Sequence, residues 1–91
     1  MIRSFRHKGL YRFFEHNDAR GIRQDLAARC RRRLNALHRA EILADLQLPG
    51  FDFHALHGAP RRYTIHLNGP WCITFEWGDG DAYRVDLEQY H

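Results

Sequence analysis

The spacing of the hydrophobic residues changes from helical to alternating near the breaker Pro49-Gly50. Before this point apolar side chains recur at intervals of three and four, which predicts a helix from about 7 to 16 and a longer helix from 22 to 39. A short alternating strand over 2–5 precedes them, and residues 41–46 are expected to add one helical turn. The apolar stripe of the longer helix consists of Ile22, Leu26, Cys30, Leu34 and Leu37.

After the breaker, apolar and polar residues alternate, which is typical of half-buried strands. This spacing predicts four strands, over 51–56, 61–67, 71–77 and 82–88. The turn sequences Asn68-Gly69-Pro70 and Gly78-Asp79-Gly80-Asp81 would join the last three as hairpins. A short N-terminal strand, two helices and an antiparallel meander predict an α+β fold with the helices packed on one side of the sheet. Without an internal repeat or linker, residues 1–91 are expected to form a single domain.

The charge is distributed unevenly along the chain. Residues 1–39 carry 11 Lys and Arg against 3 Asp and Glu, a net of +8, and residues 40–91 carry 3 against 8, a net of −5. Arginine supplies 13 of the 14 positive charges, and its planar fork can bind phosphate with two hydrogen bonds. The basic half is therefore a candidate surface for nucleic acid. A solvated face, or a face covered by an acidic partner, is the alternative.

Several classes of protein are disfavoured by what the sequence lacks. No apolar run approaches the ~18 residues of a membrane span, and no secretory signal is recognisable, so a cytoplasmic protein is expected. Cys30 and Cys72 fit no metal-binding spacing and are expected to be reduced thiols. No P-loop, dinucleotide fingerprint or nucleophile elbow is present. We therefore expect neither a metal nor a cofactor.

The sheet half is rich in imidazole and phenol groups, contributed by His54, His57, His66, His91, Tyr63, Tyr83 and Tyr90. Together with arginines, these groups suit metal-free cleavage of RNA. A base takes the proton from a 2′-OH, an acid protonates the leaving 5′-oxygen, and cations stabilise the charge on phosphorus. A histidine in a strand is more often structural, however, and a chain terminus often frays.

Four segments of the sequence resemble one family of proteins. They are residues 1–10 and 53–58, the stretch 68–75 that contains Trp71-Cys72-Ile73-Thr74-Phe75, and the closing pair Tyr90-His91. Together they resemble HigB-like toxins, the host-inhibition toxins of type II toxin–antitoxin systems in the RelE/ParE superfamily. The resemblance extends over essentially the whole chain.

This resemblance implies a compact fold in which two helices pack on a curved antiparallel sheet. It implies an endoribonuclease that enters the A site of the ribosome and cleaves the mRNA there. It also implies a cognate antitoxin, a helix-turn-helix protein of the HigA type, which holds the toxin and represses the shared operon.

The resemblance also identifies candidate catalytic residues. His54 matches the family's strand histidine, and Tyr90 and His91 match its C-terminal pair. The two histidines would share the roles of general base and general acid, and Tyr90 would shape the site or stack on a base. The basic residues of the long helix would face the phosphates of 16S rRNA, and the candidates are Arg23, Arg29, Arg32 and Arg33.

Three positions depart from the family pattern. The family commonly has Arg at the position of Cys72, an acidic residue at that of Gln89 and often Lys at that of His57. A phosphate-binding cation could come instead from His57, Arg61, Arg62 or Arg84. Glu88 or Asp86 could replace the carboxylate, although strand alternation places Glu88 on the opposite face from Gln89.

These departures keep two other functions open. One is a non-enzymatic inhibitor of DNA gyrase, like the ParE toxins, which would need no histidine pair. The other is a degenerate toxin that acts only in antitoxin binding and operon regulation.

Overall fold

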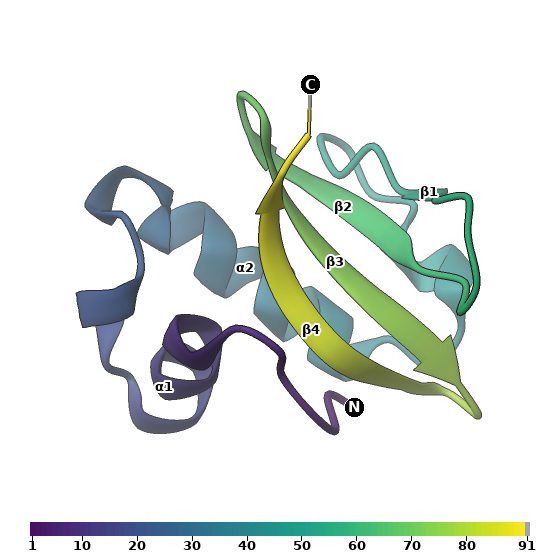
Figure 1. Cartoon of the computed structure of the whole chain (residues 1–91), viewed down its shortest axis with the longest axis horizontal. Helices are drawn as coiled ribbons and strands as arrows, with labels where there is room; N and C mark the ends of the chain where they lie inside the picture. Colours follow the sequence, from purple (N-terminus) through teal and green to yellow (C-terminus); the bar gives the residue numbers. More distant parts are fainter. Residues whose placement is uncertain (91) are drawn as a thin grey trace.

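The structure, a computed structural model, describes residues 1–90 of the chain. Its elements are α1 (Lys8–His16), the short 3-10 helices η1 (Ala19–Gly21) and η2 (Gln24–Leu26), α2 (Ala27–Arg39), η3 (Leu43–Leu46), β1 (His54–Ala55), β2 (Tyr63–Asn68), β3 (Trp71–Gly78) and β4 (Asp81–Gln89). The strands form one antiparallel sheet in the order β1-β2-β3-β4 (Figure 1). The α+β prediction is confirmed. No helix within residues 1–90 is long and apolar enough to cross a membrane.

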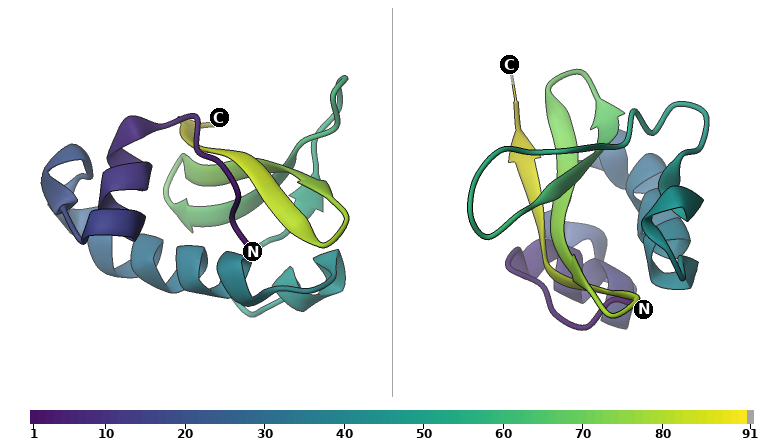
Figure 2. Two further views of the ribbon diagram at one scale, coloured as in Figure 1. Left: turned by 90° about the horizontal axis from the view of Figure 1, so that it is seen from below. Right: turned by 90° about the vertical axis from the view of Figure 1, so that its right-hand side faces the viewer.

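Helix α2 lies along one face of the sheet, and the hydrophobic core fills the space between them (Figure 2). Leu34 and Leu37 of α2 are fully buried, as are Ile65, Ile73 and Phe75 of the sheet. Burying these apolar surfaces away from water is the main force that holds the two layers together. All five residues of the predicted helical stripe belong to this core.

Helix α2 begins five residues later than the hydrophobic spacing predicts. Ile22 has extended backbone dihedral angles (φ −121°, ψ 134°), and residues 24–26 form the single 3-10 turn η2. Ile22 and Leu26 are nevertheless buried, because the segment leading into α2 follows the same side of the core. Hydrophobic spacing indicates which residues are buried. In this segment the buried residues begin at Ile22, before the first α-helical hydrogen bonds of α2.

The N-terminal segment runs beside β4 without forming a regular strand. It makes two isolated parallel bridges, Ile2 with Ala82 and Phe5 with Val85, in place of the strand expected over 2–5. The pairing of β4 with β3 is interrupted near Arg84. This residue has a left-handed backbone (φ 48°) and lies within an irregularity of the β3–β4 register. A bulge of this kind bends a strand and re-aims its side chains.

Strand β1 is much shorter than the expected strand over 51–56. Asp52 has a left-handed backbone (φ 45°), which turns the chain between the buried Phe51 and the paired residue His54. The ladder therefore contains only His54 opposite Thr64 and Ala55 opposite Tyr63. This short strand presents His54 at the edge of the sheet.

Candidate active site on the open face of the sheet

The face of the sheet opposite α2 carries a row of polar side chains. Residues directly opposite each other in a sheet share a face. The register aligns His54 with Thr64, Thr64 with Thr74, and Thr74 with Asp86. A second row on the same face runs His66, Cys72, Glu88. The candidate residue His54 thus lies on the same face as polar side chains from every other strand.

An arginine, a threonine and two carboxylates are linked across this face. Arg62 donates from Nη1 to Glu76 Oε2 and from Nη2 to Thr74 Oγ1, both at 3.0 Å. Thr74 Oγ1 donates to Glu88 Oε2 at 2.6 Å, and the hydroxyl of Tyr90 donates to the same oxygen at 3.1 Å. Tyr90 is thereby connected to the interior of the open face.

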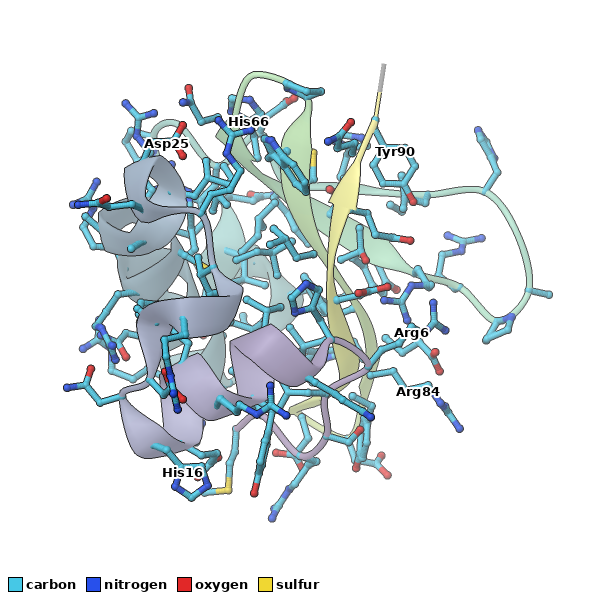
Figure 3. The ribbon with its side chains drawn as sticks, turned by 60° about the vertical axis from the view of Figure 1, so that its left-hand side comes forward. Arg6, His16, Asp25, His66, Arg84 and Tyr90 are labelled. Atoms are coloured by element: carbon cyan, nitrogen blue, oxygen red, sulfur yellow. The ribbon has the colours of Figure 1, made fainter. Side chains whose placement is uncertain are left out.

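The candidate cations differ in their exposure to solvent. The side chain of Arg62 is 14% exposed, whereas that of Arg84 is 63% exposed, and both pair with Glu76 at 3.0 Å. Arg61 and His57 are exposed in the segment that joins β1 to β2. Arg84 of β4, Tyr90 just after this strand and Arg6 of the N-terminal segment lie on the side of the molecule away from α2 (Figure 3). Arg84 is therefore placed to meet an anion, while Arg62 is held inside the network.

The ring of His54 has a defined hydrogen-bond partner. Its Nδ1 lies 2.8 Å from the carbonyl oxygen of Asp52, and the residue is exposed. Because a carbonyl oxygen can only accept, Nδ1 carries the proton in this contact. In the neutral ring Nε2 is then unprotonated and able to accept a proton, as a general base must.

Tyr90 is held at both its backbone and its side chain. Its backbone N–H donates to the carbonyl oxygen of Pro70 at 2.7 Å, and its hydroxyl donates to Glu88. Burial and the hydrogen bond to Glu88 raise the pKa of the phenol, so the hydroxyl stays protonated at neutral pH. His91, the other member of the predicted C-terminal pair, lies outside the described residues.

Comparison with known proteins decides the family. Residues 3–91 match a family model described as the RelE-like toxin of the type II toxin–antitoxin system HigB. The chain is also 36% identical over 92 residues to a Proteus vulgaris protein named Endoribonuclease HigB, with all of both chains covered. This chain belongs to the HigB-like toxin family.

Two carboxylates of this toxin, Glu88 and Asp86, are the candidates to replace the acidic residue that the family commonly has at the position of Gln89. Glu88 does face the open side of the sheet, where it contacts Tyr90, and Gln89 is exposed. Asp86 lies on the same face, but its carboxylate is 3.7 Å from Arg6 of the N-terminal segment. Of the two carboxylates, Glu88 is the one in contact with a candidate site residue.

The arginines of the toxin's long helix do not all lie on its surface. Arg29 and Arg32 are exposed, and Arg23 is exposed with its guanidinium 2.8 Å from Asp25. The prediction that Arg33 faces rRNA is wrong, because only 8% of this residue is exposed. Its Nε donates to the carbonyl oxygen of His66 at 2.7 Å, and burial lowers its pKa. A buried guanidinium cannot face rRNA.

The position of Arg33 was visible in the helical spacing. It is three residues after Cys30 and four before Leu37, which places it at the edge of the buried stripe. Sequence reasoning also missed Thr74 and Glu76 as members of the site. Alternation along 71–77 puts both on the open face, but nothing local distinguishes them from ordinary polar strand residues.

One cavity of the toxin, of about 360 Å³, is lined by Arg12, Asp18, Arg20 and Gly21 and includes none of the candidate site residues.

Proposed function

We propose that this toxin is an endoribonuclease that cleaves mRNA in the A site of the ribosome by metal-independent attack of a 2′-OH. The full-length similarity to an endoribonuclease supports the activity. The observation that carries the chemistry is His54, which is exposed on the open face with Nδ1 bonded to a carbonyl and Nε2 available. Ribosome dependence follows from the family resemblance alone.

The proposed reaction uses one base and one acid. His54 Nε2 removes the proton of the 2′-OH, and the 2′-oxygen attacks the adjacent phosphorus. The bond from phosphorus to the 5′-oxygen breaks, and His91 supplies the proton to that leaving oxygen. The products are a 2′,3′-cyclic phosphate and a free 5′-hydroxyl. His54 has then gained one proton and His91 has lost one. The neutral ring of Tyr90 would stack on a base beside the scissile bond.

Positive charge at the reacting phosphate would come from Arg84 and Arg61, with His57 as a third candidate. The exposure of these side chains supports this assignment. Arg62 would act more remotely, because it is occupied by Glu76 and Thr74. Such cations stabilise the extra negative charge of the transition state more than that of the substrate.

The exposed arginines of the helical half would bind the ribosome. Arg23, Arg29 and Arg32 would contact phosphates of 16S rRNA, and the affinity should fall as salt rises. A cognate antitoxin of the HigA type would hold the toxin in the cytoplasm of its host. Membership of a type II toxin–antitoxin family supports the existence of that partner.

The test is primer extension on a defined mRNA with programmed ribosomes. Wild type should cut only when ribosomes are present, and His54→Ala and His91→Ala should abolish the cuts. The matched control is His16→Ala, which removes an exposed histidine from α1 and should leave cleavage unchanged. A folded wild type that binds antitoxin and cuts nothing would favour gyrase inhibition or a purely regulatory role.

A further inference from the structure

Thr74, Glu76 and Glu88 of the open face have no part in the proposed reaction, yet hydrogen bonds link them to one another through Arg62 and Thr74. Thr74 is fully buried, although it lies on the face away from the core. Its hydroxyl accepts from Arg62 and donates to Glu88, so both its donor and one of its acceptor sites are used. Glu76 binds Arg62 through one carboxylate oxygen and Arg84 through the other. A sheet face that served only to contact solvent would not need a connected series of hydrogen bonds of this kind.

From this geometry we infer that Glu88 is a positioning residue, which fixes the ring of Tyr90 in the cleavage site and is itself held in place by Thr74 and Arg62. The inference rests on the proposed ribonuclease function. Glu88 and Tyr90 are two residues apart and so project from the same side of the chain. The hydroxyl of Tyr90 reaches Glu88 Oε2 at 3.1 Å.

The need for such a residue follows from where Tyr90 lies. Tyr90 comes after the last residue of β4 and is 44% exposed, so neither the pairing of the strand nor burial in the core holds its side chain. Its only tie to the sheet through the backbone, within the described residues, is the hydrogen bond to Pro70. That bond places the Cα atom but leaves the side chain free to rotate. The second attachment, at the hydroxyl, restricts the ring to one orientation.

Glu88 can hold Tyr90 in place because Glu88 is itself held by a buried residue of the sheet. Its Oε2 accepts from the buried Thr74 at 2.6 Å, and Thr74 is in turn bound by Arg62. Arg62 also donates to the backbone carbonyl of Arg84 at 2.9 Å, so the network ends on the main chain of β4. Hydrogen bonds that involve charged groups are roughly twice as strong as neutral ones.

This arrangement gives a physical reading of one departure from the family pattern. Gln89 stands where an acidic residue is common, and it lies on the opposite face from Tyr90. In this chain Glu88 supplies a carboxylate on the same face as Tyr90, one residue earlier. This chain therefore does have a carboxylate near the position where the family commonly has one, and the phenol of Tyr90 is its hydrogen-bond partner.

The experiment compares cleavage rates on programmed ribosomes for five proteins: wild type, Glu88→Leu, Glu88→Gln, Tyr90→Phe and the double variant Glu88→Leu/Tyr90→Phe. Glu88→Leu should reduce the rate by about tenfold to a hundredfold, the size expected for losing one hydrogen bond to an ionised group. Glu88→Gln keeps an oxygen acceptor and should retain most of the rate. Tyr90→Phe should lose as much as Glu88→Leu, and the double variant should be no slower.

Gln89→Leu is the matched control, because it makes the same kind of change one residue away on the opposite face and should have no effect. A second readout does not depend on activity. The ultraviolet titration of Tyr90, obtained by subtracting the curve of Tyr90→Phe, should move to lower pH in Glu88→Leu, since Glu88 helps to raise the pKa of this phenol.

The outcomes separate the two hypotheses. Wild-type rates in Glu88→Leu, or a double variant whose loss is the product of the single losses, would overturn the positioning role while leaving the nuclease intact. A wild type that cuts nothing would instead refute the nuclease. In that case an unchanged Tyr90 titration in Glu88→Leu would also refute the anchor, and a shifted titration would retain it as a feature of the fold.

Discussion

The two faces of β3 are equally buried at their centre, but one consists of apolar side chains and the other of polar side chains. Phe75 on the α2 side and Thr74 on the open side are both fully inaccessible to solvent. Phe75 is surrounded by apolar and aromatic side chains, with the ring of Tyr63 at 5.8 Å. Thr74 is enclosed by Arg62 and Glu88, to which it is hydrogen-bonded. Burial alone therefore does not distinguish the core face of the sheet from the face that carries the candidate site.

The difference lies in what each face requires of its neighbours. Apolar packing is non-directional and tolerates exchange of residues of similar size. A buried polar group must instead find a partner of defined geometry, and losing that partner costs more than the bond is worth. The open face thus depends more strongly on the exact identity of its residues. The proposed nuclease would need this, because its side chains would have to be held in reactive positions.

The two cysteines offer the largest contrast between the faces. Burial in the core raises the pKa of Cys30 to about 12, while Cys72 is partly exposed on the open face. Since only the thiolate reacts, a rise from 9.0 to about 12 lowers the reactive fraction of Cys30 about a thousandfold at pH 8. An alkylating reagent should therefore label Cys72 alone in the native protein.

Mass spectrometry after a timed reaction with iodoacetamide measures both sites. Cys30 should become appreciably labelled only when the protein is unfolded or when the pH approaches 12, because very little of its thiol is ionised at lower pH. Equal labelling of both cysteines at pH 8 in folded protein would contradict the placement of Cys30 in the core. Cys72→Ser is the control that identifies the reactive site.

The next contrast is in stability, between Phe75→Ala and Thr74→Val. Removing the ring of Phe75 should lower the free energy of unfolding by about 3–5 kcal/mol, because a cavity remains in the core. Replacing Thr74 by Val keeps its shape and should cost about 1–2 kcal/mol through the lost hydrogen bonds. Urea denaturation followed by circular dichroism measures both values. Equal costs would show that the two faces are held by the same kind of packing.

The third contrast is between stability and activity at His54. His54 is exposed at the sheet edge, so His54→Ala should change the free energy of unfolding by less than about 0.5 kcal/mol. Cleavage on the ribosome should nevertheless fall by at least about a hundredfold, the usual minimum for losing a general base. Denaturation and primer extension on the same preparation provide both numbers. A loss of activity that tracks a loss of stability would make His54 a structural residue.

The sequence allowed much of this architecture to be predicted, and its failures have physical causes. The helical stripe from Ile22 to Leu37 was correct because core burial imposes its own spacing. The strand over 51–56 was wrong in extent because a left-handed Asp52 ends the pairing. The polar network could not be foreseen, because Arg62 lies outside any strand and reaches across β3 to the main chain of Arg84. Contacts between residues so distant in sequence leave no local pattern.

The smallest expected effect concerns Glu76, which joins the network to the exposed cation Arg84. Its side chain is 14% exposed and holds two guanidinium groups at 3.0 Å, one on each oxygen. Glu76→Gln keeps the shape but leaves two neighbouring positive charges uncompensated, and should lower the free energy of unfolding by about 1 kcal/mol. Asp79→Asn in the exposed turn is the control and should change it by less than about 0.5 kcal/mol. The cost of Glu76→Gln should shrink at high salt, because added ions screen the repulsion between the two arginines. A variant as stable as wild type at low salt would mean that Arg62 is held by Thr74 and the Arg84 carbonyl alone, and that the open face depends on hydrogen bonds rather than on charge pairs.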